Sequence, residues 1–280
     1  MLAFVFTGLT SRVGLLSDPP SENVVKSFDD NLFSKITQDF HVYIVGDTDC
    51  YERACTYFGK ERVIQCVNVP TTNNLKNFVN KPKPNLRWPE HINNVGLTNL
   101  FIKMALTADA IKQEYDAIIR IRHDVILGED LSRYIFKIIS EPSVDLACIY
   151  DWVMVGKQNI IKYILDTDRR GYTITPQPDF DTTSLLTKKE LGLWRENPGI
   201  PSNAPEIVFS NIVLDYYNKN GISPKGRLYN ICMDFGRPYD PSHHEPHVLV
   251  LKNTSKHNID FDLLNEQSSF PGTPSSQGSV

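Results

Sequence analysis

Four polar side chains with clear chemical uses interrupt one apolar stretch, Tyr115–Leu127, which reads Y-D-A-I-I-R-I-R-H-D-V-I-L. Most of its other residues are apolar and β-branched, the composition of a buried strand. The interruptions are Arg120, Arg122, His123 and Asp124. An unpaired charge is costly to remove from water, so a buried strand carries such residues only where they are compensated or used. The pattern therefore indicates either an internal Arg–Asp ion pair at the strand edge or a ligand site.

A ligand site is expected at the carboxyl end of a central strand, because open α/β sheets bind their ligands there. In such a place the Asp124 carboxylate would hold a divalent metal ion. Arg120 and Arg122 would face phosphate oxygens, which match the fork of a guanidinium group. Metal and arginines together would offset the charge of a diphosphate leaving group and ease the breaking of its bond.

The elements that must position these residues begin with an apolar strand, Leu2–Phe6, and the loop T-G-L-T-S-R behind it. Gly8 permits a tight turn, and Thr7 and Arg12 are donors of the kind that a nucleotide site after the first strand requires. An ordinary βα loop has a similar composition. The loop therefore supports a nucleotide site only together with the charged strand end.

A second predicted strand, His41–Val45, ends in an acidic loop that contains Asp47. This loop suits contacts to a base or ribose, and it equally suits capping of the helix expected at Tyr51–Phe58. A third strand is predicted at Arg62–Val69. The alternation of strands and helices predicts a parallel sheet with crossover helices.

Beyond the third strand the regular alternation stops. The segment Pro70–Glu90 contains four prolines and several basic residues, which predicts a long surface loop that closes over a bound donor. Apolar residues from Leu97 to Ile111 then recur at i, i+3, i+4 and i+7, which predicts an amphipathic helix with one core-facing stripe. Residues 166–204 are expected to shape an acceptor pocket, and a helix is predicted from Pro205 to about Asn218.

Composition limits the class of protein. The 280 residues allow one large α/β domain or two small ones. A net charge of −4 gives no reason to expect nucleic acid as a partner. Five cysteines without a C-x-x-C pair are expected to stay reduced. Neither a signal peptide nor an apolar run of about 20 residues is visible, so we expect a cytoplasmic protein without a transmembrane segment.

The charged strand resembles a family pattern. The run D-A-I-I-R-I-R-H-D-V-I-L is similar to the "YD-x-x-x-R-x-R-x-D" strand of GT-A-type glycosyltransferases, in which Arg-x-Asp-like sequences replace the commoner Asp-x-Asp metal motif. The segments F-V-F-T-G-L-T-S-R and P-E-I-V-F-S-N-I-V-L-D-Y-Y fit the same plan. Enzymes that look related occur in bacterial surface-polysaccharide clusters and in large algal viruses; for a viral chain the expected location is the host cytoplasm. The resemblance covers about residues 1–235.

This resemblance implies a GT-A-like fold, with a Rossmann-like, mixed and mostly parallel sheet flanked by helices. It implies a nucleotide-diphosphate sugar donor, UDP-linked, a manganese or magnesium ion, and transfer of a hexose or pentose to a glycan or glycoprotein acceptor. Arg122 stands where the first carboxylate of Asp-x-Asp would be, so this motif supplies the metal with one carboxylate only. We expect a single domain over 1–267, with a nucleotide-sugar half over 1–127 and an acceptor half over 128–267. Residues 268–280 have the composition of a disordered tail.

An enzyme that inverts configuration also needs a carboxylate to accept the proton of the attacking hydroxyl. Two residues in the acceptor half qualify. Asp151 ends a strand beside Trp152, where a sugar ring could stack. Glu206 follows Pro205 at a helix start, and the family resemblance places an acidic residue at such a position. An acid there also simply complements the helix dipole; Glu206 ranks slightly ahead of Asp151.

Two other functions remain open on the sequence alone. The chain could be a non-catalytic module that binds nucleotide sugars or glycans, or a metal-dependent phosphohydrolase or nucleotidyltransferase. The second would need more clustered carboxylates than are visible, because two-metal sites are built from several. The late cluster His243, His244 and His247 could supply a metal ligand or form a solvated loop.

Overall fold

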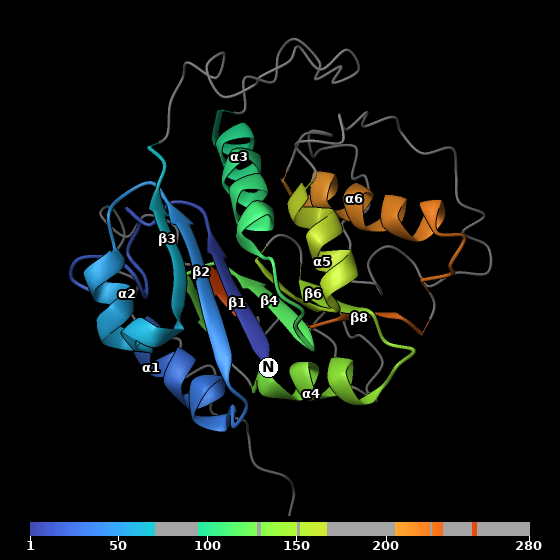
Figure 1. The fold of residues 1–280 in the computed structure, drawn as a ribbon, viewed down its shortest axis with the longest axis horizontal. Coiled ribbons are helices and arrows are strands. Elements are labelled where there is room, and N and C mark those ends of the chain that lie inside the picture. The colour runs from blue at the N-terminus through green and yellow to red at the C-terminus, as the bar shows by residue number, and fades with distance from the viewer. Residues whose placement is uncertain are drawn as a thin grey trace, which may run out of the picture.

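The computed structural model describes residues 1–70, 95–127, 130–149, 152–166, 205–224, 226–231 and 248–250. One seven-stranded sheet within them has the order β3-β2-β1-β4-β7-β6-β8 (Figure 1). Strand β7 is antiparallel to β4 and β6, and the other neighbours are parallel. The predicted mixed, mostly parallel α/β sheet is therefore confirmed. Its strands are β1 (Leu2–Thr7), β2 (Phe40–Gly46), β3 (Val63–Asn68), β4 (Ala117–Ile121), β6 (Leu146–Ile149), β7 (Val153–Gly156) and β8 (Leu228–Asn230).

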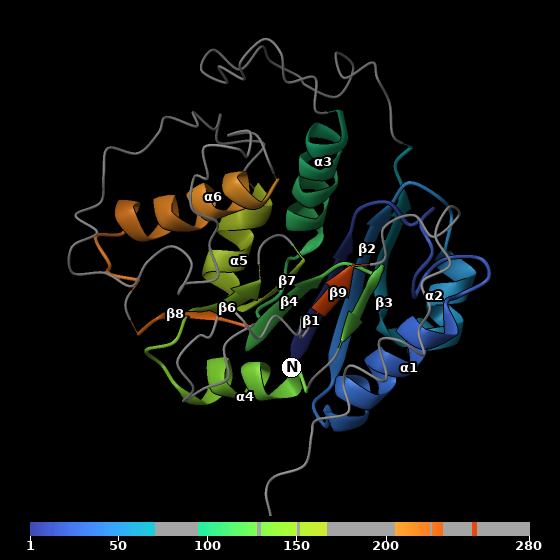
Figure 2. The same ribbon diagram turned by 180° about the vertical axis from the view of Figure 1, so that it is seen from behind.

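Helices cover both faces of this sheet (Figures 1 and 2). One core joins the sheet to α1 (Glu22–Asn31), α2 (Tyr51–Phe58) and α4 (Ser132–Ser140). The core on the opposite face joins it to α3 (Val95–Ala110), α5 (Gln158–Leu165) and α6 (Pro205–Lys219). Single helical turns of the 3₁₀ type lie at Phe33–Lys35 and Lys60–Arg62.

Strand β1 lies at the centre of the sheet because its side chains are apolar on both sides. Leu2, Phe4 and Phe6 enter the α1/α2 core, and Ala3 and Val5 enter the α3/α6 core. Continuous apolar runs are typical of parallel strands that helices cover on both faces. The expected strand Leu2–Phe6 is thus confirmed.

The apolar run Tyr115–Leu127 does not form one strand. It divides into β4 and a short strand β5 (Val125–Leu127), which pairs with β9 (Val248–Val250) in a separate two-stranded ribbon. The interruption coincides with the polar residues 122–124. These residues leave the sheet where β4 ends, and their side chains pair with one another and with the loop after β1.

Helix α3 differs from the predicted amphipathic helix. Its apolar stripe does pack on the sheet, but the polar residues Asn99, Lys103 and Thr107, which are spaced four apart, are buried as well. The helix packs against both strands and neighbouring helices, so almost every side of its described part is covered. The prediction of a single core-facing stripe is wrong in this respect.

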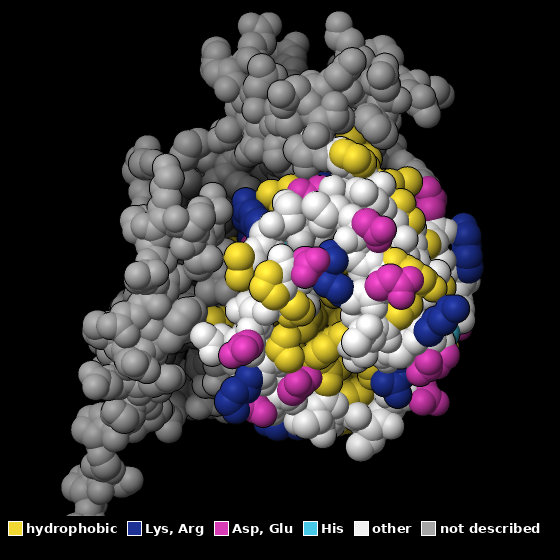
Figure 3. Space-filling view, turned by 90° about the vertical axis from the view of Figure 1, so that its left-hand side faces the viewer, with side chains coloured by type: hydrophobic (Ala, Val, Ile, Leu, Met, Phe, Trp, Pro, Cys, Tyr) yellow, Lys and Arg dark blue, Asp and Glu magenta, His cyan; other side chains and the backbone are white. Residues whose placement is uncertain are grey.

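The surface seen in Figure 3, on the side of α1 and α2, carries acidic and basic side chains interspersed around apolar ones. No continuous basic area is visible in the described part of this face. In the parts of the chain that the structure describes, every helix is too short or too polar to cross a membrane.

Candidate functional site at the carboxyl edge of the sheet

The order of the strands creates a switch point beside β1. The chain adds β2 and β3 on one side of β1 and then crosses to place β4 on the other side. In open α/β sheets, ligands bind where the order reverses in this way, outside the carboxyl ends of the strands. We call the ends of β1, β2 and β4 the carboxyl edge. Both segments that the sequence singled out, 7–12 and 120–124, begin in the last residues of β1 and β4, the two strands that flank this switch point.

Asp124 is buried at this edge, with 2 % of its surface exposed. The Arg122 guanidinium donates two hydrogen bonds to its carboxylate, Nε to Oδ1 at 2.8 Å and Nη2 to Oδ2 at 2.7 Å. Arg12 Nη1 lies 3.5 Å from Oδ2. Burial would raise the pKa of Asp124, but the hydrogen bonds and charges of the arginines hold that pKa below its usual range. Asp124 is therefore a buried, ionised carboxylate between two guanidinium groups.

Arg120 points to the α3/α6 face of the sheet and is almost fully buried. Its Nε donates to Thr7 Oγ1 at 3.4 Å, and its guanidinium lies 5.2 Å from the centre of the Phe209 ring on α6. Thr7 and Arg120 are thus close in space, one at the end of β1 and the other near the end of β4. Gly8, the next residue, has a φ of +146°, a conformation that favours glycine.

His123 fastens the loop after β1 to the end of β4. Its Nε2 donates to the Leu9 carbonyl at 2.7 Å, and the Leu15 N–H donates to the His123 carbonyl at 2.7 Å. A Cβ on Gly14 would lie 2.3 Å from that carbonyl oxygen, so only glycine fits there. Burial lowers the pKa of His123, which keeps the imidazole neutral. The sequence assigned no role to His123; its position among the polar residues that interrupt the apolar run was the available signal.

Asp47 fastens the same loop to β2. The Ser11 N–H and hydroxyl donate to its carboxylate at 2.8 and 2.6 Å, and Thr10 Oγ1 donates at 3.2 Å. Burial would raise the pKa of Asp47, but the Ser11 hydrogen bonds hold it below its usual range. Asp47 does not cap the next helix; Asp49 accepts a hydrogen bond from the Tyr51 N–H there at 3.1 Å. Asp49 thus accepts a hydrogen bond at the start of α2 from the position before the N-cap residue, Cys50, which forms no side-chain capping hydrogen bond itself.

Lys103 is a further charged residue near this edge that the sequence did not identify. It lies midway along α3 with 1 % of its surface exposed. Burial lowers the pKa of its ammonium group, and the charge of Asp47 partly opposes that effect. The available signal was that Lys103 is the one charged residue among the fourteen of 95–108.

The two candidate bases are placed only in part. Glu206 lies in the first turn of α6, three residues before Phe209, but its side chain is outside the described part of the structure. Because the Phe209 ring contacts Arg120, the start of α6 lies near the end of β4. Several other predicted features lie outside the described residues. They are Asp151, the predicted surface loop beyond Pro70, the cluster His243, His244 and His247, and the tail over 268–280.

A divalent metal fits this edge to a limited extent. Asp124 is ionised, as a ligand must be, and within the described part of the chain its Oδ1 accepts from Arg122 only, whereas Oδ2 accepts from both Arg122 and Arg12. Among the described residues no three His, Cys, Asp or Glu side chains gather to hold a metal ion. Asp124 can therefore contribute one ligand, and phosphate oxygens and water would have to supply the others.

The described charges at this edge are positive in excess, with four cations against the carboxylates Asp47 and Asp124. Such an excess attracts anions. The cations come from the loop after β1, from α3, and from the end of β4, which are separate in sequence and meet only in the fold. They are Arg12, Lys103, Arg120 and Arg122.

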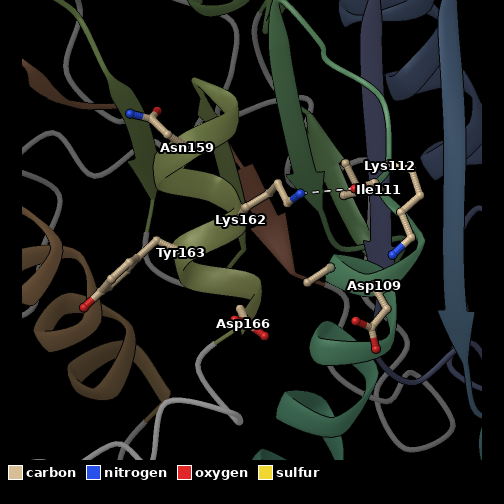
Figure 4. Close-up of a pocket in the computed structure, with 8 residues that line it drawn as sticks. Asp109, Ile111, Lys112, Asn159, Lys162, Tyr163 and Asp166 are labelled. Carbon is tan, nitrogen blue, oxygen red and sulfur yellow. Dashed lines mark hydrogen bonds between the residues drawn. The ribbon is translucent and has the colours of Figure 1, made fainter.

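A hollow of about 480 Å³ lies elsewhere, between the C-terminal end of α3 and helix α5 (Figure 4). Lys162 Nζ donates to the Ile111 carbonyl at 3.1 Å on its wall. Lys112 and Tyr163 also line it, and none of the residues predicted to form a site does. This hollow is therefore separate from the carboxyl edge.

Comparison with known proteins finds no matching family model, no matching curated protein and no matching solved structure. What the chain does must be inferred from its own residues. The relevant ones are the buried carboxylate Asp124, the cations around it, and the switch point that they flank.

Proposed function

We propose that this chain is a GT-A-type glycosyltransferase that moves a hexose or pentose from a UDP-sugar to a glycan or glycoprotein acceptor. The observation that carries the proposal is the buried, ionised Asp124 beside the switch point, held by Arg122 and approached by Arg12. The strand that bears it resembles the Arg-x-Arg-x-Asp strand of that family. The mixed, mostly parallel sheet is also the architecture expected of such an enzyme.

The donor would lie across the carboxyl ends of β1, β2 and β4. Asp47, which Ser11 of the loop after β1 already holds in place, would face the base or ribose. Thr7, Gly8 and Arg12 line the turn after β1, where a pyrophosphate can approach the backbone closely. Arg120 would support this turn through its hydrogen bond to Thr7.

Arg122 would exchange one negatively charged partner, Asp124, for another, the diphosphate of the donor. Without ligand, both its Nε and Nη2 are engaged by Asp124. A diphosphate offers acceptors of the same planar, bidentate kind, so Arg122 would transfer its hydrogen bonds to phosphate oxygens and leave Asp124 open. Bound manganese or magnesium, held by Asp124, would supply further neutralisation of the leaving diphosphate. Arg12, already near Asp124 Oδ2, would offset the negative charge that develops on the leaving diphosphate as the sugar–phosphate bond breaks.

The attacking hydroxyl would lose its proton to a carboxylate on the acceptor side. We assign this role to Glu206, with Asp151 as the second candidate, for an enzyme that inverts configuration. Support for Glu206 comes from its position one turn before Phe209, whose ring lies against Arg120. A retaining enzyme would not need either residue as a base.

Ligand-induced stabilisation tests the donor site. A panel of nucleotide sugars should be screened for shifts in melting temperature with and without manganese, since a ligand that binds the folded state raises the midpoint. We expect at least one UDP-sugar to raise it, and more so with manganese. If neither nucleotide sugars nor nucleoside diphosphates shift the midpoint, the proposed function is wrong. Stabilisation without any turnover would favour the non-catalytic module instead.

A further inference from the structure

The lysine at position 103 is an unusual residue for the interior of a protein. It lies in the middle of α3 with 1 % of its surface exposed, while α3 packs on β1 and β2. Its neighbours one turn away, Asn99 and Thr107, are also buried. The Thr107 hydroxyl donates to the Lys103 carbonyl at 3.1 Å, so it satisfies the helix backbone and not the ammonium.

Burial of this ammonium group costs stability. An ammonium group removed from water needs an opposite charge or several acceptors close by. Among the described residues, no acidic side chain forms a hydrogen bond or an ion pair within 4.0 Å with Lys103 Nζ. The nearest opposite charge is Asp47, which is close enough for each to shift the pKa of the other.

Asp47 does not serve as the structural counter-ion of Lys103. Its carboxylate is occupied by the Ser11 N–H, the Ser11 hydroxyl and the Thr10 hydroxyl. A purely structural pair would be expected to close to hydrogen-bonding distance, as Arg122 and Asp124 do. Asp47 therefore acts on Lys103 through its charge and not through a hydrogen bond, which leaves the ammonium able to take a further anionic partner.

Helix α3, which carries Lys103, packs on one face of the sheet, against β1 and β2. Alternation along β1 and β4 places Thr7 and Arg120 on the face that α3 and α6 cover. The Phe209 ring bridges these helices, lying 5.7 Å from the Phe101 ring of α3 and 5.2 Å from the Arg120 guanidinium. The Gln65 side chain of β3 donates to the Leu106 carbonyl at 3.3 Å, and α3 runs from the carboxyl edge back towards the start of β4. Lys103, one turn before Leu106, is therefore nearer to the carboxyl edge.

We propose that Lys103 is a phosphate-binding residue, which receives a phosphate group of the nucleotide ligand where the β1 and β2 loops meet α3. This inference rests on the proposed function. A compact ammonium group on a flexible stem binds phosphate as a point charge, and inside a protein that attraction is stronger than in water. A ligand with two or more negative charges would compensate the buried cation. Lys103 would then lower the stability of the ligand-free protein and raise the stability of the complex with the ligand.

The test uses Lys103→Met, which keeps the length of the side chain and removes its charge, with Lys103→Gln as a second variant. Lys112→Met is the matched control, because Lys112 is exposed and lies just past the C-terminal end of the same helix. For each protein, the melting temperature without ligand and the affinities for uridine, UDP and inorganic pyrophosphate would be measured, the affinities by calorimetry. Comparison of uridine with UDP separates base contacts from phosphate contacts.

We expect Lys103→Met to melt at the same temperature as the wild type or higher, because a costly buried charge is gone. Its affinity for UDP and pyrophosphate should fall about tenfold to a hundredfold, the worth of one hydrogen bond to a charged group. Its affinity for uridine, and all affinities of Lys112→Met, should be unchanged.

Three results would overturn the inference. Both Lys103 variants could bind UDP as tightly as the wild type, or lose affinity for uridine and UDP to the same extent. They could instead melt well below the wild type, which would make Lys103 a structural counter-ion. These results differ from a failure of the proposed function, in which the wild type itself would bind neither UDP nor pyrophosphate.

Discussion

Asp124 stays ionised inside the protein because guanidinium groups surround it. The apolar run around it predicted a strand end with either an ion pair or a ligand site. The structure contains the ion pair, at a position where ligands bind in this class of sheet. That Arg122 would hold both oxygens could not be predicted, since it depends on how the chain turns after Ile121. The two alternatives are compatible if a diphosphate displaces Arg122 from the carboxylate.

Replacement of Asp124 by Asn tests this pair, because it preserves the shape and removes the charge. We expect the free energy of unfolding at pH 7 to fall by about 1–3 kcal/mol, the range for hydrogen bonds to charged groups. The pKa of Asp124 is lower in the folded state, so its contribution is complete above about pH 4 and is lost as the pH falls through the folded value. Urea denaturation should therefore separate Asp124→Asn from the wild type at pH 7, and the two should converge in acid.

Asp30→Asn is the control for this measurement, because Asp30 pairs with Lys26 on the exposed side of α1. Such surface pairs contribute little, and stability should hardly change. If Asp124→Asn is as stable as the wild type at pH 7, the carboxylate is not held as the structure describes.

At the scale of elements, the loop after β1 is the part that positions the site. It is fastened to β4 through His123 and to β2 through Asp47. Its composition predicted a nucleotide loop or an ordinary connection, but not these two attachments, because they join residues more than 30 positions apart. The loop therefore reaches its shape through long-range contacts, and its own turn residues are only part of the reason.

Gly14→Ala should disturb this loop more than any change of its exposed residues. The new Cβ would lie 2.3 Å from the His123 carbonyl oxygen and 2.6 Å from its Nδ1. Backbone atoms cannot move aside cheaply, so we expect a loss of about 1–3 kcal/mol in the free energy of unfolding, the usual cost of overpacking. Donor affinity should fall as well, because Asp124 follows His123 directly. Unchanged stability in thermal and urea denaturation would show that the loop is not packed against His123.

For helix α3, the periodicity of the apolar residues did not predict which polar residues are buried. Its apolar residues predicted the face toward the sheet correctly, and its polar residues were assigned to solvent by default. Asn99, Lys103 and Thr107 are instead buried, because the helix is enclosed on most sides. A lone lysine in an apolar helix has two explanations, an exposed face or an interior function, and one helix in isolation cannot distinguish them.

For the molecule as a whole, strands from both predicted halves share one sheet. β1 to β4 come from the first half, and β6, β7 and β8 extend the same sheet from the second. The parallel part followed from alternating strands and helices in the sequence. The antiparallel insertion of β7 between β4 and β6 was not predicted, because short apolar strands carry no signal of direction. The start of α6 approaches Arg120 through this arrangement, which brings a candidate base toward the donor edge.

The release of UDP from UDP-sugars in the presence of manganese and a mixture of glycans tests the central claim most directly. Wild type, Asp124→Asn, Glu206→Gln and Asp151→Asn should be compared at equal folded concentration. We expect the wild type to release UDP from at least one donor, and Asp124→Asn to lose this activity together with metal-dependent donor binding. Glu206→Gln should bind the donor normally and transfer about a hundredfold more slowly, the usual worth of a positioned base. Full activity in Asp124→Asn, or no release from any donor that the wild type binds, would contradict the account.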